Sequence, residues 1–273
     1  MKSPKISIIT CVLNSEKHLP ECINSVNNQT YKNFEQVFID GFSTDRTLEI
    51  IKKLQPKSHI YKEFGKGIYR AINKGLKMAK GEIIGFLHSD DTFADNQALA
   101  RVATAFEKNP NLDFYCSRML VKDDNLKNSF AILGAPPHKQ TWKEALYSPS
   151  YYAHPTYYCR RSTIEKVGSY NVSYKIASDI DWLMRLEKLN LNWYFDKKPL
   201  IKFRSSDKSA STQKYFLALK EEFQIRVKRD GLSLFLLVIY GYHFCRRGLR
   251  FTLQKLHLNF LIDFFRKILI KFS

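Results

Sequence analysis

The stretch Gly81-Glu82-Ile83-Ile84-Gly85-Phe86-Leu87-His88-Ser89-Asp90-Asp91 contains a short apolar run that ends in two adjacent carboxylates. Such a run, bounded by a glycine, predicts a buried β-strand. In an open α/β sheet, ligands bind just beyond the carboxyl ends of the strands. Two acids at that place suit a divalent cation, because Mg²⁺-like ions take few protein carboxylates and complete their shell with water and substrate phosphate. The alternative is a polar turn that leads into a helix starting near Asn96.

The first half of the chain alternates between strand and helix patterns. Strands are expected at 5–12, 34–39, 59–62 and 112–116, and helices at 19–26, 48–54, 68–78 and 98–106. The short links between these elements predict an α/β fold with a largely parallel, Rossmann-like sheet flanked by helices. After residue 116 the alternation decays, and residues 117–160 are expected to be rich in loops.

Regular patterns return at Ser178. The spacing Ser178-x-x-Asp181 matches a capping box, so a helix is expected to begin there with Asp181 in a structural role. Short strands are expected at 191–195 and 200–203. Upstream lies a tyrosine cluster that either packs in the core or forms a platform for a flat ligand such as a sugar ring: Tyr147, Tyr151, Tyr152, Tyr157 and Tyr158.

Residues 204–212 read as a polar linker, and we place a domain boundary there. This gives one domain over 1–210 and a helical C-terminal region over 211–273. Two helices are expected at 213–229 and 232–244, followed by an amphipathic helix near the end of the chain. Apolar residues recur in that last helix at helical spacing: Leu253, Leu256, Phe260, Leu261, Phe264, Phe265 and Ile268.

The formal net charge of +18 points to an anionic partner. From Ile201 onward the chain has 15 Lys and Arg against 5 Asp and Glu, so more than half of the excess lies in its last quarter. These basic residues lie among Leu, Ile and Phe, which favours an anionic membrane surface over nucleic acid. The alternative is a helix that packs on its own domain or on the partner subunit of a homodimer.

Cysteine usage and hydropathy indicate the compartment. The 5 cysteines are scattered without a C-x-x-C pair, which favours a reducing compartment over a disulfide framework or a zinc site. The N-terminus runs straight into a strand, so we expect no signal peptide. No uninterrupted apolar run reaches the ~18 residues of a confident membrane-spanning helix.

Polar residues gather where the predicted strands end. Asp40 closes the second strand, Asp90 and Asp91 close the strand of the opening stretch, and Thr10 and Asn14 follow the first strand. Because the carboxyl ends of parallel strands share one edge, these side chains are expected to converge. Asp179, at the start of a later helix, is either a favourable charge in the first turn or a general base.

Several segments, in order over about residues 5–205, resemble the family 2 inverting glycosyltransferases, whose nucleotide-diphospho-sugar-binding domain has the GT-A fold. The segments are Ile8-Ile9-Thr10-Cys11-Val12-Leu13-Asn14, Asp40-Gly41-Phe42-Ser43-Thr44-Asp45, Lys66-Gly67-Ile68-Tyr69, Asn73-Lys74-Gly75, Gly85-Phe86-Leu87-His88-Ser89-Asp90-Asp91, His154-Pro155-Thr156 with Arg160-Arg161, and Ala177-Ser178-Asp179-Ile180-Asp181. An NAD-dependent oxidoreductase is disfavoured, because no G-x-G-x-x-G follows the first strand.

The resemblance implies a role for each matching position. Asp179 would be the catalytic base that deprotonates the acceptor hydroxyl, and Asp91 would bind Mg²⁺ or Mn²⁺. The remaining matches would bind the nucleotide sugar, with Asp40 at the base, Asp90 near the ribose or diphosphate, and His154 and Arg204 near the acceptor or diphosphate. The full nucleotide-sugar set is Thr10, Asn14, Asp40, Ser43, Asn73, Asp90, His154 and Arg204.

The resemblance also implies an activity. The chain would move a sugar, with inversion, from a UDP- or dTDP-linked donor to a hydroxyl of a lipid-linked saccharide acceptor in bacterial surface polysaccharide biosynthesis. Together with the basic C-terminal region, this predicts a peripheral enzyme on the cytoplasmic face of the bacterial inner membrane. The alternative is a catalytically inactive sugar-nucleotide-binding or scaffolding member of the same fold.

Two positions depart from the pattern of the similar enzymes, which usually have an acid at Arg70 and Asn at His88. Arg70 either pairs with a donor phosphate or carboxylate or lies on a solvated face. His88 is either a metal ligand or a hydrogen-bonded histidine at the strand end.

Overall fold

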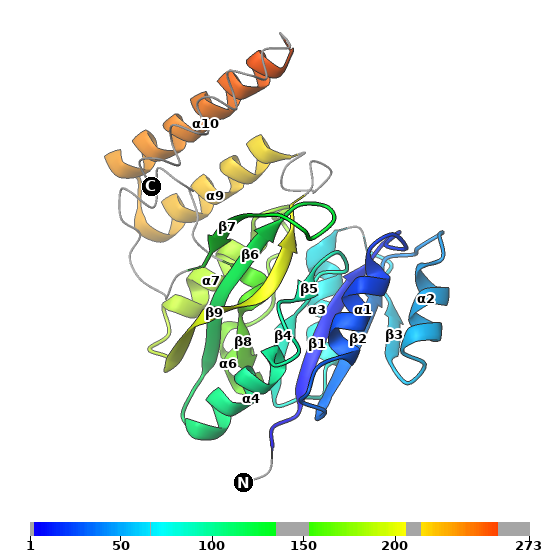
Figure 1. The fold of residues 1–273 in the computed structure, drawn as a ribbon. Coiled ribbons are helices and arrows are strands. Elements are labelled where there is room, and N and C mark those ends of the chain that lie inside the picture. The colour runs from blue at the N-terminus through cyan, green and yellow to red at the C-terminus, as the bar shows by residue number, and fades with distance from the viewer. Residues whose placement is uncertain (1–2, 66, 135–152, 206–213, 256–273) are drawn as a thin grey trace. The chain divides into compact units, whose positions relative to one another are not determined.

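The computed structural model describes residues 3–65, 67–134, 153–205 and 214–255, and Figure 1 shows how their elements are arranged. The strands are β1 (Ile6–Val12), β2 (Phe34–Asp40), β3 (His59–Lys62), β4 (Ile83–Phe86), β5 (Thr92–Phe93), β6 (Phe114–Lys122), β7 (Ser129–Leu133), β8 (Tyr158–Arg160) and β9 (Trp193–Arg204). The helices are α1 (Leu19–Asn27), α2 (Thr47–Leu54), α3 (Ile68–Met78), α4 (Ala98–Lys108), the 3₁₀ turn η1 (His154–Thr156), α6 (Arg161–Val167), α7 (Ser178–Glu187), α9 (Tyr215–Asp230) and α10 (Leu234–Lys255).

The strands form one mostly parallel sheet. Its order is β3-β2-β1-β4-β8-β6-β9-β5, with β7 paired to β6. β1 pairs in parallel with β2 and β4. β8 is antiparallel to both β4 and β6, and β6 is parallel to β9, so β4, β6 and β9 point the same way. The carboxyl ends of these strands therefore share one edge with those of β1 and β2, where an open α/β sheet binds ligands.

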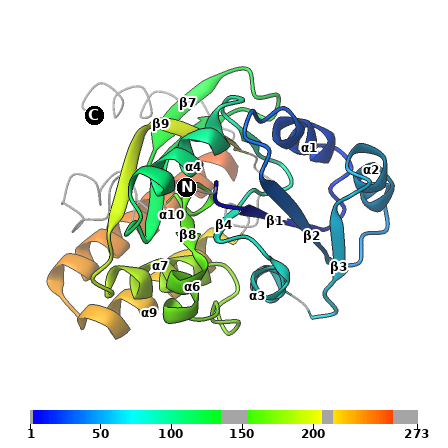
Figure 2. The same ribbon diagram turned by 90° about the horizontal axis from the view of Figure 1, so that it is seen from below.

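Helices cover both faces of the sheet, as the two views in Figures 1 and 2 show. On one face α1 and α4 bury Ile23 and Val102 in the same apolar cluster. On the other face α3, α6 and α7 bury Ile72, Ile164 and Leu183 in a second cluster. This two-sided burial is the reason that the first strands read as nearly continuous apolar runs.

Two strands illustrate how the sequence specifies this packing. In β1, Ile8 joins the first cluster and Ile9 the second, because successive side chains of a strand point to opposite faces. In β4, Gly85 lies opposite Tyr158 of β8, and a Cβ on Gly85 would lie 2.3 Å from the tyrosine ring. Glycine at this position therefore permits the close pairing of β4 with β8.

The tyrosine cluster is only partly within the described residues. Tyr157 and Tyr158 are buried in the core, and the Tyr157 ring stacks on Phe114 with centroids 5.9 Å apart. Core packing is therefore the role of these two. Tyr147, Tyr151 and Tyr152 lie outside the described residues.

The region expected to be rich in loops contains strands. β6 continues to Lys122, and β7 and β8 both pair with it. A single strand, β9, replaces the two short ones expected at 191–195 and 200–203, and most of its length pairs with β6. These pairings join segments far apart in sequence, so no local pattern reports them.

The prediction of a capping box at the start of α7 is wrong. The N-cap residue is Ala177, and no side chain caps the helix. Asp181 instead pairs with Arg185 one turn later, with 3.0 Å between Oδ2 and Nε. The structural role expected for Asp181 is thus served by a salt bridge within the helix.

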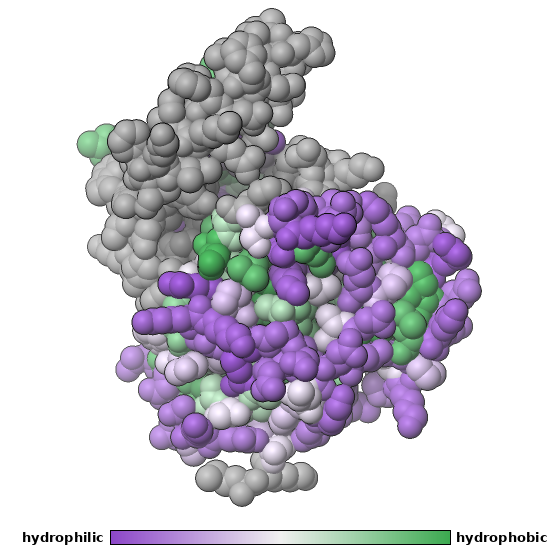
Figure 3. Space-filling model, in the orientation of Figure 1, coloured by the Kyte–Doolittle hydropathy of each residue, from purple (hydrophilic) through white to green (hydrophobic). Residues whose placement is uncertain are grey.

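The described residues form two compact units, one ending at residue 214 and the other beginning at Tyr215. The face of the first unit in Figure 3 is mainly hydrophilic, with hydrophobic side chains in small separate areas. In the second unit, Phe216 contacts Phe244 and Phe223 contacts Tyr240, with ring centroids 5.1 and 5.5 Å apart. This pairing order shows that α9 and α10 run in opposite directions.

Helix α10 is continuous through residue 244, where a separate helix was expected to end. One stripe of α10 is apolar and exposed, and consists of Leu234, Leu237, Val238 and Leu249. The amphipathic stripe expected from Leu253 to Ile268 lies outside the described side chains. Among the described helices, none has the length and apolar character needed to span a bilayer.

Candidate active site

The loops after β1 and β2 are joined by hydrogen bonds. The Asn14 main-chain N–H donates to Ser43 Oγ at 3.1 Å, and the Thr44 N–H donates to Asn14 Oδ1 at 2.9 Å. The buried Asp40 carboxylate accepts from the N–H groups of Phe42 and Ser43 at 3.2 and 3.1 Å. Asn14, Asp40 and Ser43 thus lie together as expected, and Asp40 holds the turn after β2. Their contacts with a nucleotide stay a prediction.

This turn presents an exposed aromatic pair. Phe42 has a φ of +70°, a left-handed conformation that is rare for a bulky residue, and the hydrogen bonds of this turn to Asp40 hold it there. Its ring lies 4.5 Å from that of Phe64, between centroids, and Phe64 is 82% exposed. Lys62 Nζ lies 5.5 Å from the Phe42 ring centroid. The arrangement offers an aromatic surface and a positive charge beside Asp40.

The acids of the opening stretch lie between β4 and β5. Asp91 is fully buried, and its Oδ1 accepts the Arg204 main-chain N–H at 2.8 Å. The Arg204 side chain donates from Nε to the Asp90 carbonyl at 2.8 Å and from a terminal nitrogen to Glu21. β5 pairs with the end of β9, which brings Arg204 to this turn. Burial and the adjacent Asp90 charge raise the pKa of the Asp91 carboxyl well above its usual range.

The remaining oxygen of Asp91 is the site's main clue to a metal. Asp91 Oδ2 is buried and has no hydrogen-bond partner, although buried polar atoms are nearly always satisfied. Within the described residues, no group of three or more His, Cys, Asp and Glu is placed to hold a metal ion. Asp91 with Asp90 nevertheless fits an ion of the Mg²⁺ type, which draws most of its shell from water and substrate phosphate.

Asp179 lies in the first turn of α7 and is held by α3. Its Oδ1 accepts the Tyr69 hydroxyl at 3.0 Å. Burial raises the pKa of Asp179, and the hydrogen bond from Tyr69 acts in the opposite direction. A carboxylate with a raised pKa suits a general base. The nearby His88 also favours the ionised form of Asp179, which places the end of β4 close to the start of α7.

Three residues of the expected nucleotide-sugar set form hydrogen bonds with other residues of the protein. Thr10 lies inside β1, buried, and accepts from Gln36 Nε2 at 2.9 Å. The Asn73 carboxamide bonds both the N–H and the carbonyl of Tyr170, at 2.8 and 2.9 Å. His154 is buried, and its Nε2 lies 2.8 Å from the Tyr170 hydroxyl. These hydrogen bonds occupy the three side chains within the protein, and their contacts with a nucleotide sugar stay a prediction.

The surroundings of His154 determine its charge. Burial, with a smaller effect of the nearby His88, lowers the pKa of His154 to about 3. Its ring stacks on Phe86 with centroids 4.8 Å apart. His154 is therefore a neutral core residue, and it provides no positive charge for a diphosphate.

Sequence reasoning assigned no role to Tyr69, Phe42, Phe64 or Glu21. Tyr69 and Phe42 lie in segments that resemble the family. No sequence pattern predicts which residues they contact. Phe42 and Phe64 each follow a strand within a few residues, and two aromatic residues just beyond neighbouring strand ends are a signal that sequence alone contains. The pairing of Arg204 with Glu21, 183 positions earlier, has no local signature.

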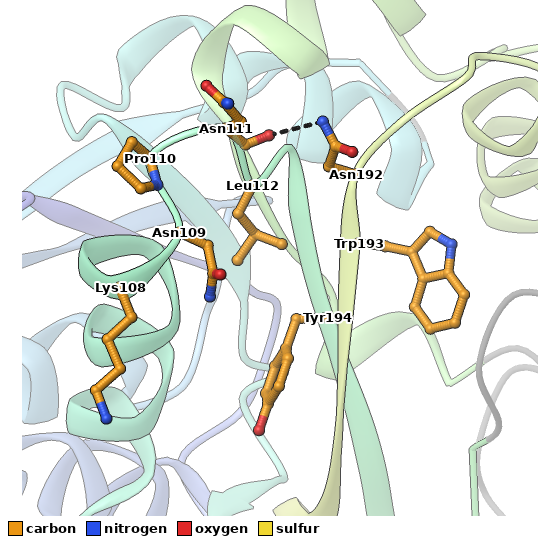
Figure 4. A pocket seen from close by; sticks show the side chains of 8 residues that line it. All are labelled: Lys108, Asn109, Pro110, Asn111, Leu112, Asn192, Trp193 and Tyr194. Carbon is orange, nitrogen blue, oxygen red and sulfur yellow. Dashed lines mark hydrogen bonds between the residues drawn. The ribbon is translucent and has the colours of Figure 1, made fainter.

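A further pocket, of about 330 Å³, lies at the opposite edge of the sheet. Figure 4 shows its lining where β6 and β9 begin, with Trp193 extending away from the side on which Leu112 and Tyr194 lie. Two asparagine side chains of its lining donate hydrogen bonds to main-chain carbonyls. Asn192 Nδ2 donates to the Asn111 carbonyl at 3.1 Å, and Asn109 Nδ2 donates to the Ala105 carbonyl at 3.0 Å. The acids that mark the candidate site all lie at the other edge.

Solved structures share this fold. The chain aligns with residues 1–349 of TarS from S. aureus with a TM-score of 0.61 and 22% identity, over 88% of this chain and 72% of that fragment. The mannosyltransferase PcManGT from Pyrobaculum calidifontis aligns with a TM-score of 0.62 and 15% identity, over 89% and 70% of the two chains. The protein is therefore an α/β protein of the GT-A class of glycosyltransferase folds.

Sequence comparison gives the family. The family model for Glycosyl transferase family 2 matches residues 7–168, which is more than half of the chain. A PGL/p-HBAD biosynthesis glycosyltransferase of Mycobacterium tuberculosis is 30% identical over 189 residues, or 68% of this chain and 70% of that one. The O-antigen biosynthesis protein RfbC of Myxococcus xanthus is 28% identical over 85% of this chain but only 18% of its own length. The chain belongs to glycosyl transferase family 2.

Proposed function

We propose that this glycosyltransferase transfers a sugar, with inversion, from a UDP- or dTDP-linked donor to a hydroxyl of a lipid-linked saccharide in bacterial surface polysaccharide biosynthesis. The observation that carries the proposal is the buried, partnerless Oδ2 of Asp91 beside Asp90. An unpaired buried carboxylate is costly unless a cation completes it. The names of the mycobacterial glycosyltransferase and of RfbC support a role in surface glycans.

The nucleoside of the donor would lie at the ends of β1 and β2. The Phe42–Phe64 pair provides a face on which a base stacks, and Lys62 provides charge beside it. TarS was solved with UDP and with UDP-GlcNAc, whereas PcManGT was solved with GDP-Man and Mn²⁺. Our choice of a pyrimidine rests on the family resemblance at Asp40, which orders the turn that presents Phe42.

The diphosphate would lie at the end of β4. Asp91, with Asp90, would hold Mg²⁺ or Mn²⁺, as the Mn²⁺ complex of PcManGT supports. A divalent ion bound there would offset the charge that develops on the departing nucleoside diphosphate. Arg204 fixes the Asp90–Asp91 turn through its main-chain and side-chain hydrogen bonds, and its buried guanidinium adds positive charge near the same place.

The reaction we propose is a single displacement. The acceptor oxygen forms a bond to the anomeric carbon of the sugar while the bond from that carbon to the diphosphate oxygen breaks. Asp179 takes the proton of the acceptor hydroxyl as the attack proceeds. The electron pair of the broken bond leaves with the nucleoside diphosphate, and the anomeric configuration inverts.

The location we propose is the cytoplasmic face of the inner membrane, with the C-terminal unit as a peripheral anchor. The exposed stripe of α10 supplies apolar side chains, and the basic residues of the last quarter of the chain supply attraction to anionic lipid. A lipid-linked acceptor would be reached from that surface.

The proposal is tested by titrating the protein calorimetrically with UDP, dTDP, GDP and ADP, each with and without Mn²⁺. We expect metal-dependent binding of UDP or dTDP that is tighter than that of both purine nucleotides. Tighter binding of GDP or ADP would refute the donor assignment. Binding that is indifferent to metal would refute the role of Asp91.

A further inference from the structure

Tyr69 is the second residue of α3, and its ring is held by packing. It is 6% exposed, and it stacks on Tyr170 with centroids 6.0 Å apart. Tyr170 stacks in turn on Trp182 of α7, at 5.1 Å. Because the Tyr69 ring is buried against Tyr170, which is itself held by Trp182, the position of the Tyr69 hydroxyl is restrained as well.

That hydroxyl lies between two acceptors. One is Asp179 Oδ1 at 3.0 Å, and the other is the main-chain carbonyl oxygen of Ile176. A phenol has a single proton and can serve only one of them fully at a time. The two acceptors differ chemically, because the Asp179 carboxylate can gain a proton and the peptide carbonyl cannot.

We propose that Tyr69 is the positioning residue for Asp179, and that its hydroxyl supports this side chain in both protonation states. The inference rests on the proposed function, in which Asp179 receives the proton of the acceptor hydroxyl. While Asp179 is ionised, Tyr69 donates to it and fixes the direction of its other oxygen. Once Asp179 is protonated, the Tyr69 proton turns to the Ile176 carbonyl, and the Tyr69 oxygen is free to accept from the new carboxyl O–H.

The charged and titratable groups around Asp179 are consistent with this arrangement. Burial and the Asp179 charge both raise the pKa of Tyr69, so the phenol stays protonated and acts as a donor. His88 faces Asp179 from the end of β4, and Tyr170 faces it from the loop before α7. Arg185 is engaged with Asp181 and with the carbonyls of Val167 and Ser169.

Removal of the Tyr69 hydroxyl should change the pKa of Asp179 in a predictable direction. The hydrogen bond from Tyr69 to the ionised carboxylate is charge-assisted and therefore stronger than the one that the protonated carboxyl makes to Tyr69, so the hydroxyl lowers the pKa of Asp179. In Tyr69→Phe the pKa of Asp179 should rise by about one pH unit, the order expected for a hydrogen bond to a charged group. The acid limb of the pH profile should move upward by the same amount.

The experiment compares full-length wild type with Tyr69→Phe. The pKa of Asp179 is read from the carboxyl ¹³C resonance of labelled protein, assigned by its loss in Asp179→Asn. The matched control is Tyr115→Phe, which removes another buried Tyr–Asp hydrogen bond, 2.7 Å from the Tyr115 hydroxyl to Asp196 Oδ2. We expect the shift in Tyr69→Phe and none in the control.

Kinetics give the second readout. Tyr69→Phe should lower kcat about tenfold, a part of the ~10²–10⁴ that a positioned base contributes, with the KM for the donor unchanged. An unchanged pKa of Asp179, or an equal shift in Tyr115→Phe, would overturn the inference. A shifted pKa in a protein that transfers no sugar from any nucleotide donor would instead refute the proposed function and leave the hydrogen-bond role of Tyr69 standing.

Discussion

The carboxylate of Asp91 has two properties that rarely occur together: complete burial and an oxygen without a partner. Its raised pKa has a consequence for stability. A carboxyl whose pKa is higher in the folded than in the unfolded state is destabilising once it ionises. Without metal, the free energy of unfolding should therefore fall as the pH rises from the unfolded pKa through the folded one.

The first prediction follows from this pH dependence of the free energy of unfolding. Asp91→Asn removes the buried charge, so in EDTA its free energy of unfolding at pH 7.5 should equal or exceed that of wild type. In Mn²⁺ the variant should bind UDP at least tenfold more weakly and turn over more slowly, because the ion contacts the diphosphate. Urea denaturation and calorimetry measure the two effects. Asp91→Asn that binds UDP in Mn²⁺ as tightly as wild type would contradict the metal assignment.

The second prediction separates Asp179 from Asp181. Asp179→Asn should leave UDP affinity nearly intact and cut the single-turnover transfer rate by ~10²–10⁴, the usual contribution of a general base. Asp181→Asn is the matched control, because it loses only a partly exposed pair with Arg185. Such pairs contribute about 0–1 kcal/mol, so its transfer rate should be that of wild type. The reverse result would identify Asp181 as the base.

The third prediction concerns Phe64. Its ring is 82% exposed and contacts Phe42, so Phe64→Ala should leave the free energy of unfolding almost unchanged. If a base stacks on this pair, the change should weaken UDP binding about tenfold, since a stacked base is worth ~1–3 kcal/mol. Ile132→Ala, at another exposed apolar side chain, is the control. Equal UDP affinities in both variants would exclude Phe64 from the donor site.

The candidate site shows which residue roles a sequence can reveal. Acids that follow apolar runs can be placed at strand ends from the pattern alone, as Asp40 and Asp91 were. Whether a polar side chain is free is a tertiary property: Thr10 is committed to Gln36 and Asn73 to Tyr170. Those partners lie far along the chain, and no spacing rule relates them.

At the scale of elements, β1, β2 and β4 follow from local pattern because each is largely buried and joined by a short crossover, and the edge strand β3 follows from the same alternation of strand and helix. The later strands follow only in part. The starts of β6 and β9 were expected, but β8 and the full lengths of β6 and β9 depend on pairings over long sequence separations, which no local pattern reports. The helix expected at 232–244 was to end before a third helix, yet α10 is continuous through residue 244.

The fourth prediction compares two glycines in these elements. Gly85→Ala would place a Cβ 2.3 Å from the Tyr158 ring, which is itself fully buried. Overpacking of this kind costs about 1–3 kcal/mol, and more where the neighbour cannot move. Gly241→Ala is the control within α10, where nothing lies within 4 Å of the new Cβ. It should instead add about 0.5–1 kcal/mol of helix stability.

Thermal denaturation of both variants measures the difference. A lowered Tm for Gly85→Ala with an unchanged or raised Tm for Gly241→Ala is the expected pair of results. A Gly85→Ala protein as stable as wild type would mean that β4 and β8 can separate without cost, against the close pairing seen in the sheet.

At the scale of the whole molecule, charge and apolar surface are distributed unevenly along the chain. From Tyr215 onward the chain has 11 Lys and Arg against 4 Asp and Glu, and α10 in this part has an exposed apolar stripe. Basic residues near anionic lipid contribute about 1 kcal/mol each, and burial of a leucine side chain contributes about 1.5–3 kcal/mol. Their sum would be sufficient for reversible membrane binding, in line with the peripheral location that we propose.

The fifth prediction tests that binding on the intact chain. Wild type should float with vesicles that contain anionic lipid, and less so with neutral vesicles or at high salt, because salt screens surface charge. Leu237→Glu, on the exposed stripe, should reduce flotation about tenfold, since it places a charge where an apolar side chain would enter the lipid. Gln224→Glu makes the same change in charge at an exposed position of α9 and should float nearly as wild type does. Equal flotation of the two variants would mean that charge alone attracts the protein to lipid. If wild type does not float with any vesicle, the exposed apolar stripe of α10 does not bind lipid, and a protein contact becomes the favoured role for it.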